Sequence, residues 1–424
     1  MQGPPHDWLG RKPEPGAEMT QPSRLRTLWP YAAALVAGLA LVIGVSLGTQ
    51  PPANGASDQP LTDDTVVASL QTSKRAYPVA VQEALRATRQ APDNLASAQA
   101  AARILISEGR NAGDTRLVGA ALGVLRPFMA DPDAQTLYLA ATARQYQHDF
   151  PGALALLDDA ARRDPADVNV LLTRATVQIV LGRFDLASVD CDQLYALSRP
   201  DLGFLCQATN RLLTADAPKI YDQLTAILAQ PGVLDPALHN WARGLQGEIA
   251  ALQGDAKAAQ AHLSAVVTAD AFALRERLLL ADLLLAEGQA QQAIDLLAPA
   301  IPADGVLIRR VLAAMATGDS AMADKDRAEL AQRFKLNIDI GLTAHAREET
   351  LYFLRIAKDP DMALQRALVN WALQHEIEDA QLLVDAAIFA NQPKAAVPVV
   401  RWMAEQSVVA PSFRMPDAVT EAAK

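Results

Sequence analysis

Histidine and cysteine are the usual ligands of transition metals and frequent catalytic groups, so their spacing limits the chemistry open to this chain. The six histidines are dispersed, at positions 6, 148, 239, 262, 345 and 375. No HExxH motif is present, because His375 and Glu376 are followed by Ile-Glu-Asp without a second histidine. The phosphate-binding loop pattern and the GxGxxG dinucleotide pattern are also absent. We therefore expect no catalytic residue, no metal site and no cofactor.

The only two cysteines are Cys191 and Cys206. An isolated pair in a chain exported from the cytoplasm favours a disulfide. A turn near Arg199 and Pro200 lies about midway between them, so two antiparallel helices would bring the sulfur atoms face to face. The alternative is a pair of buried thiols that pack as small apolar side chains. CxxC spacing is missing, which argues against a redox-active pair.

An apolar segment near the N-terminus predicts the location of the protein in the cell. No charged residue occurs between Arg26 and Asp58, and residues 28–48 form an apolar run long enough to cross a bilayer as a helix. We expect one transmembrane helix there. A cleaved signal peptide is the main alternative, but its apolar region is usually shorter. A buried core helix is a weaker alternative, because a run that is apolar on every side needs a large protein around it.

The charges beside this segment predict its orientation. Arg24 and Arg26 precede it and Asp58 follows it, so the positive-inside rule places the N-terminus in the cytoplasm. Residues 1–27 are rich in proline and are expected to be a disordered cytoplasmic tail, with residues 49–60 as a linker. The expectation is a single-pass protein of the bacterial inner membrane with its bulk in the periplasm.

Composition predicts the fold class of the remainder. Half of the 424 residues are apolar but only 5% are aromatic, a bias toward strong helix formers that indicates an all-α protein. The net charge is −10, and no basic stripe occurs along the chain. Nucleic acid is therefore not an expected partner.

A repeat of 34 residues runs through the middle of the chain. Phe150 and Phe184 are 34 positions apart, as are Ala153 and Ala187. The same spacing separates the GDAKAA and GQAQQA segments, which begin at 254 and 288. A fixed period of this length is typical of a solenoid, in which each unit buries its apolar face against its neighbours.

These residues resemble the tetratricopeptide repeat (TPR), a helix–turn–helix unit of 34 residues. Four units carry the matches: 134–167 with Leu137, Ala141, Phe150, Ala153, Leu157, Ala160 and Pro165; 168–201 with Leu171, Ala175, Gly182, Phe184, Ala187 and Leu194; 240–273 with Gly247, Gly254, Ala259, Leu263 and Val266; and 274–307 with Ala281, Gly288, Ala293, Leu297 and Ala300. Small residues let the two helices of a unit approach, and glycine ends the first helix. His148 stands where the repeat has this glycine, and no unit has the family's tryptophan in register.

The resemblance implies a right-handed superhelix, an α-solenoid of TPR-like hairpins preceded by the transmembrane helix. We expect the superhelix over residues 61–335, degenerate C-terminal helical repeats or a cap over 336–410, and a flexible tail over 411–424.

In the TPR family the concave groove is lined by the first helix of each unit. The positions that correspond here are Gln135, Tyr138, Thr142, Gln145, Asn169, Thr176, Trp241, Glu248, Arg275 and Asp282. Tyr138 and Trp241 are the best anchor candidates if their rings are exposed, since aromatic side chains contribute strongly to binding. The alternative is that each ring packs against a neighbouring helix.

Three functional hypotheses follow. The first is a membrane-tethered scaffold or assembly factor that binds another envelope protein, or a peptide segment of it, in the groove. The second is a self-assembling structural module of an envelope complex. The third, an enzyme with an unrecognised site, is the least favoured. The oligomeric state is left open.

Overall fold

The structure is a computed structural model that describes residues 77–424. The segments 1–27, 28–48 and 49–60 therefore lie outside the described residues. Residues 77–424 form helices joined by short turns and contain no β-strand, which confirms the all-α prediction for this part of the chain. None of these helices combines the length and the apolar character that crossing a bilayer requires.

The helices, in chain order, have the following bounds. They are α1 Val79–Gln90, α2 Leu95–Ala112, α3 Thr115–Leu125, α4 Ala134–Tyr146, α5 Phe150–Arg163, α6 Val168–Val180, α7 Phe184–Ala196, α8 Pro200–Arg211, α9 Ala217–Leu228, α10 Pro236–Leu252, α11 Ala256–Ala269, α12 Leu274–Ala286, α13 Ala290–Leu297, α14 Asp304–Thr317, α15 Ser320–Asp339, α16 Ala346–Tyr352, α17 Pro360–Leu373, α18 Ile377–Phe389, α19 Val397–Glu405 and α20 Asp417–Ala422. Short single turns lie at η3 Arg126–Phe128, η4 Phe353–Ala357 and η5 Pro393–Ala396.

Aspartate side chains begin many of these helices. Asp133 accepts a hydrogen bond from the amide of Thr136 at 2.8 Å, and Asp149 accepts one from Gly152 at 2.9 Å. Such caps satisfy backbone amides that have no partner within the helix. Gly182 has the left-handed backbone predicted for the glycine of the repeat turn, with φ of 68°. His148, which departs from this pattern, has φ of 58°. His148 thus adopts the backbone conformation of the glycine that it replaces.

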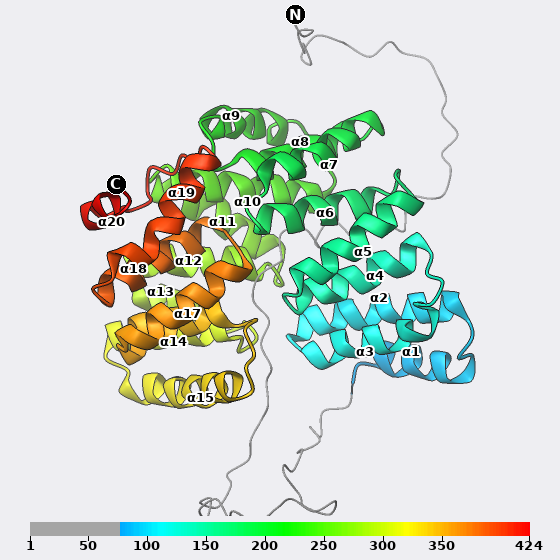
Figure 1. Ribbon diagram of the computed structural model, residues 1–424, viewed down its shortest axis with the longest axis horizontal. Helices are drawn as coiled ribbons and strands as arrows, with labels where there is room; N and C mark the ends of the chain where they lie inside the picture. The colour runs from blue at the N-terminus through cyan, green and yellow to red at the C-terminus, as the bar shows by residue number, and fades with distance from the viewer. Residues whose placement is uncertain (1–76) are drawn as a thin grey trace, which may run out of the picture.

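Most consecutive helices pack against each other as neighbours, and many even-numbered helices also contact the next even-numbered helix. The even-numbered helices contact one another from α2 to α10 and again from α12 to α18. We call α2, α4, α6, α8, α10, α12 and α14 the inner row. In Figure 1 the chain rises on the right through α1–α5, crosses the top with α6–α9 and descends on the left to α15. The structure is therefore a TPR-like helical array. Its right-handed sense stays a prediction.

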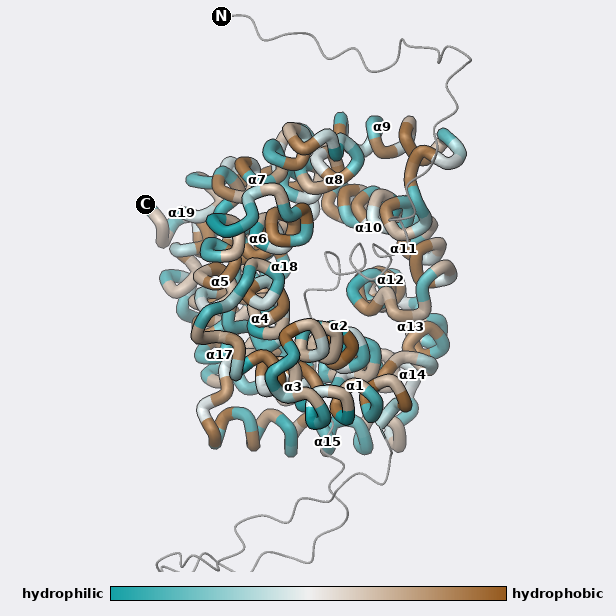
Figure 2. Tube along the Cα trace, turned by 90° about the vertical axis from the view of Figure 1, so that its right-hand side faces the viewer, coloured by the Kyte–Doolittle hydropathy of each residue, from teal (hydrophilic) through white to brown (hydrophobic). Residues whose placement is uncertain are grey.

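Small residues sit where the helices of a pair cross. A Cβ atom on Gly247 would lie 2.7 Å from Leu263, so the backbones of α10 and α11 approach more closely than a larger residue permits. Ala153 and Ala187 are fully buried. Figure 2 shows apolar and polar segments alternating along the helices, as expected when each helix buries one face.

The C-terminal part differs from the sequence expectation in two respects. Helix α15 runs from Ser320 to Asp339 and crosses the expected domain boundary at 335/336 without a break. The segment 411–424, expected to be a flexible tail, contains α20, whose Val419 side chain is fully buried in the core of the C-terminal helices. Helix α20 packs against both η5 and α19.

Candidate functional site

The C-terminal helices fold back across the inner row and enclose a cavity against it. The backbone amide of His375, just before α18, donates to the carbonyl of Val180 at 2.8 Å. The amide of Val409 donates to Leu213 at 2.6 Å, and Ser412 donates to Leu252 at 3.0 Å. In Figure 1, α17, α18 and α19 lie in front of α10–α13. The C-terminal helices therefore cover part of the inner row and also form the end of the array.

The cavity has a volume of about 310 Å³, within the usual range of ligand sites. Its walls come from α6, α8, α10 and α12 on one side and from the start of α18 and the loop after α19 on the other. Apolar side chains make up most of the wall: Ile179, Val180, Phe184, Leu212, Leu213, Trp241, Leu245, Ala251, Leu252, Leu279, Ile377 and Phe413. The polar lining consists of Thr176, Thr209, Asn210, Glu248, Arg275, His375, Glu376, Glu378, Gln381 and Ser412.

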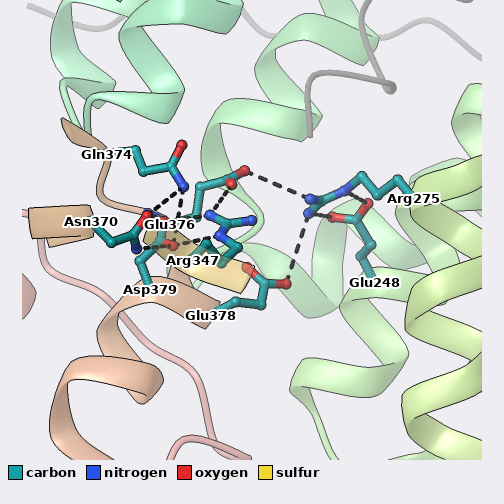
Figure 3. A network of polar contacts seen from close by, with 8 residues as sticks. All are labelled: Glu248, Arg275, Arg347, Asn370, Gln374, Glu376, Glu378 and Asp379. Carbon is teal, nitrogen blue, oxygen red and sulfur yellow. Dashed lines mark hydrogen bonds and ion pairs between the residues drawn. The ribbon is translucent and has the colours of Figure 1, made fainter. Parts of the chain in front are cut away.

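Arg275 is the centre of a charged network on this wall (Figure 3). Its Nε atom donates to Glu248 Oε1 at 3.0 Å, which joins α12 to α10. Its Nη1 atom lies 3.7 Å from Glu376 Oε1, and its Nη2 atom lies 3.9 Å from Glu378 Oε1. Burial alone would lower the pKa of Arg275, but the surrounding carboxylates raise it well above its usual value. Arg275 is therefore a permanent cation surrounded by carboxylates of α10 and α18.

A second guanidinium continues the network away from the cavity. Arg347 of α16 donates to Glu376 Oε2 and to Asp379 Oδ1, each at 2.6 Å. Asp379 also accepts from the Asn370 amide at 2.7 Å and from the backbone amide of Glu376 at 2.9 Å. Glu376 and Asp379 form a capping box at the start of α18, where the helix dipole favours negative charge. The network thus fixes the position of α18 on the inner row.

The carboxyl groups of this network differ in their ease of ionisation. Burial opposes the charge on Glu376, but Arg347 and Arg275 outweigh that effect and lower its pKa. Burial raises the pKa of Glu378, because Arg275 is too distant to compensate fully. Burial also lowers the pKa of His375, which favours the neutral ring. Glu376, which forms a short ion pair with Arg347, is therefore a more stable anion than Glu378.

The structure brings four of the predicted groove residues to this cavity: Thr176, Trp241, Glu248 and Arg275. The others are elsewhere. Asp282 pairs with Arg309 on α14, while Gln135, Tyr138, Thr142, Gln145 and Asn169 lie on α4 and α6 without lining the cavity. The rings of Tyr138 and Trp241 are only 4% and 3% exposed, so both are packed between helices rather than displayed as free anchors. Trp241 still contributes one wall of the cavity.

Sequence reasoning missed the residues that α16 and α18 contribute: Arg347, Glu376, Glu378 and Asp379. The acidic run after His375 was their only signal in the sequence. It has the form of a solvated helix start, and its partners Arg275 and Arg347 are far away in the chain. In the structure Cys191 and Cys206 form a disulfide, which joins α7 to α8 with the Cα atoms 5.3 Å apart. Within residues 77–424 no group of three His, Cys, Asp or Glu side chains is arranged to hold a metal ion.

Two known structures resemble this fold distantly. A chain of the APC/C hetero-tetramer Cut9-Hcn1 is 13% identical with a TM-score of 0.44, and the match covers 80% of this chain but only 64% of that one. Yeast Tom70 is 12% identical with a TM-score of 0.37, over 81% of this chain and 83% of Tom70. No family model and no curated protein matches the sequence. Neither likeness indicates a function for this chain.

Proposed function

We propose that this protein is a membrane-tethered helical-repeat scaffold that holds a segment of another envelope protein against its inner row. The observation that carries the proposal is the cavity between the inner row and α18, because its walls combine apolar side chains with a few placed polar groups. An extended segment or a helix can insert a side chain there while the rest of it lies along the array. The apolar run at 28–48 supplies the tether.

The disulfide supports the extracytoplasmic placement of the array. Disulfides persist in oxidising compartments such as the periplasm and are rare in the cytoplasm. Together with Arg24 and Arg26 ahead of the apolar run, this supports an inner-membrane protein with a cytoplasmic N-terminus and a periplasmic array.

Photocrosslinking in living cells tests the scaffold role. Phe413 lines the cavity and is half-buried, so p-benzoylphenylalanine at this position keeps the native phenyl ring and adds a reactive benzoyl group at the cavity. Phe272, which is 63% exposed in the turn before α12 and does not line the cavity, is the matched control. We expect one dominant envelope protein, identified by mass spectrometry, to be captured from position 413 and not from 272.

Two other results would contradict the proposal. Capture of a second copy of this chain from position 413 would favour a self-assembling module. Equal, unspecific labelling from both positions would mean that the cavity holds no protein segment.

A further inference from the structure

The unpaired polar atoms of the cavity all accept hydrogen bonds. Asn210 is only 3% exposed, and its Nδ2 atom donates to the carbonyl of Phe184 at 2.8 Å, which fixes the orientation of the amide. Its Oδ1 atom has no partner within the described part of the chain. Glu378 Oε2 is likewise covered and without a partner among residues 77–424. Because buried acceptors are costly when unpaired, the cavity favours an occupant that brings donors.

The charges of the same wall also favour a cation. On the cavity wall, Glu248, Glu376 and Glu378 supply three carboxyl groups and Arg275 supplies one guanidinium group. Behind the wall, Arg347 and Asp379 add one charge of each sign. Burial lowers the pKa of His375 and so favours its neutral ring. Arg309 of α14 is paired with Asp282 outside the cavity, so neither residue adds a positive charge to this wall. The fully ionised network therefore has an excess of two negative charges. An acidic occupant would have to compete with three carboxylates for Arg275.

The apolar wall suits the stem of a long side chain. Trp241, Leu245 and Leu279 line the cavity beside Glu248 and Arg275. Lysine and arginine bury their methylene groups along apolar surfaces while the charged end stays with polar partners. A volume of about 310 Å³ holds one or two such side chains and excludes a whole folded element.

We propose that the cavity binds a protein segment through a lysine or arginine whose stem lies against Trp241 and whose cationic end is held by Glu378. This inference rests on the proposed function and adds the chemistry of the partner. Asn210 Oδ1 accepts a further donor from the same segment. The site selects basic segments with flanking apolar residues over neutral or acidic ones.

Peptide binding to the purified full chain in detergent micelles tests the selectivity. Four fluorescein-labelled peptides share one apolar frame and differ at a central lysine, arginine, glutamine or glutamate. By fluorescence anisotropy we expect the lysine and arginine peptides to bind about tenfold more tightly than the glutamine peptide, as one charge-assisted hydrogen bond implies. We expect the glutamate peptide to bind most weakly. Added salt should reduce the difference in affinity between the lysine peptide and the glutamine peptide.

The variant Glu378→Gln assigns the preference to this site. Its side chain is 37% exposed, so the substitution is compatible with folding, which circular dichroism checks. We expect this variant to bind the lysine peptide about tenfold more weakly than the parent protein does, with no change in affinity for the glutamine peptide. Glu83→Gln, an exposed substitution on α1, is the matched control and should change neither.

Failure of this inference is distinguishable from failure of the scaffold role. Equal binding of all four peptides, or equal losses for lysine and glutamine peptides in Glu378→Gln, would overturn the inference. If no peptide binds, the segment captured from position 413 decides: a basic segment supports the inference and an acidic or neutral one overturns it. Capture of a peptide from residues 1–76 of this same chain would mean that the occupant of the cavity is an internal segment and not a partner protein. Absence of both peptide binding and capture would overturn both proposals.

Discussion

Glu276 is a carboxyl group in surroundings that disfavour its charge. Its side chain is 4% exposed on α12, and its Oε1 atom lies 3.2 Å from where a Cβ atom on Gly244 would be, so it is enclosed between α12 and α10. Burial raises the pKa of Glu276 from 4.5 to about 7. The folded state therefore holds its proton more tightly than the unfolded state does.

The pH dependence of stability follows from this shift. Below about pH 4.5 the carboxyl group is protonated in both states, and as the pH rises toward 7 only the unfolded state releases the proton readily, so stability is lost. Glu276→Gln removes that loss. We expect the variant to match the parent near pH 4 and to be more stable at pH 8, on the order of 2 kcal/mol, in urea titrations. A uniform difference at all pH values would show that Glu276 is not the group responsible, and Glu83→Gln should show no difference.

The junction between α6 and the C-terminal helices depends on a close approach. Gly182 ends α6 with φ of 68°, and a Cβ atom there would lie 2.5 Å from Trp402 Nε1 and 3.0 Å from His375 Cβ. The repeat turn needs glycine for its backbone, and the docking of α18 and α19 needs it for space. Phe184, the equivalent of the fully buried Phe150, faces the same junction, with its ring centroid 6.1 Å from that of Trp402.

The substitution Gly182→Ala should therefore cost more than its backbone conformation explains. Gly254 has φ of 84° and open space around its Cα, so Gly254→Ala reports the left-handed strain alone, about 1 kcal/mol. We expect Gly182→Ala to be less stable than this control by about 1–3 kcal/mol in urea unfolding, because the side chain overpacks the junction. Equal losses in the two variants would mean that α19 does not contact Gly182.

The disulfide joins neighbouring pairs of helices. Cys191 on α7 and Cys206 on α8 are both buried, and the bond closes a loop with a sequence separation of 15 residues. We expect a reductant to lower the free energy of unfolding of the parent protein by about 3 kcal/mol. The variant Cys206→Ala should be insensitive to reductant. If the parent is also insensitive, the two cysteines are thiols in solution.

The molecule as a whole is more tightly connected than a linear repeat array. In such an array each unit contacts only its neighbours, and unfolding of one end need not reach the other. Here His375 contacts Leu181 across a sequence separation of 194 residues, and the loop after α19 is bonded to Leu213 and Leu252. The C-terminal helices thereby link α6, α8, α10 and α12 into one unit.

Hydrogen exchange can measure this connection. Leu383 on α18 and Leu105 on α2 are both fully buried, so either change to alanine should cost about 2–5 kcal/mol. We expect Leu383→Ala to raise amide exchange in α6, α8 and α10 as well as in α18. Leu105→Ala should affect only α1 to α4. Confinement of the Leu383→Ala effect to α16–α20 would show that the docked helices open independently.

Local features of the repeat could be predicted from the sequence because their causes act within one unit. Glycine in the left-handed turn and small residues at the crossings each act over a few residues or one neighbouring helix. The 34-residue period therefore predicted helical pairs, and it assigned Trp241, Glu248 and Arg275 to the first helices of their units, which are α10 and α12 in the structure.

The cavity and its charges were decided only by the tertiary structure. Whether α18 reaches α6, α10 and α12 depends on the curvature summed over many pairs, and no local pattern in the sequence records that sum. For the same reason the acidic residues before and within α18 could not be assigned to Arg275 and Arg347. The burial of Tyr138 and Trp241 was also decided only by the tertiary structure, because the exposure of a ring depends on neighbours that the repeat pattern does not specify.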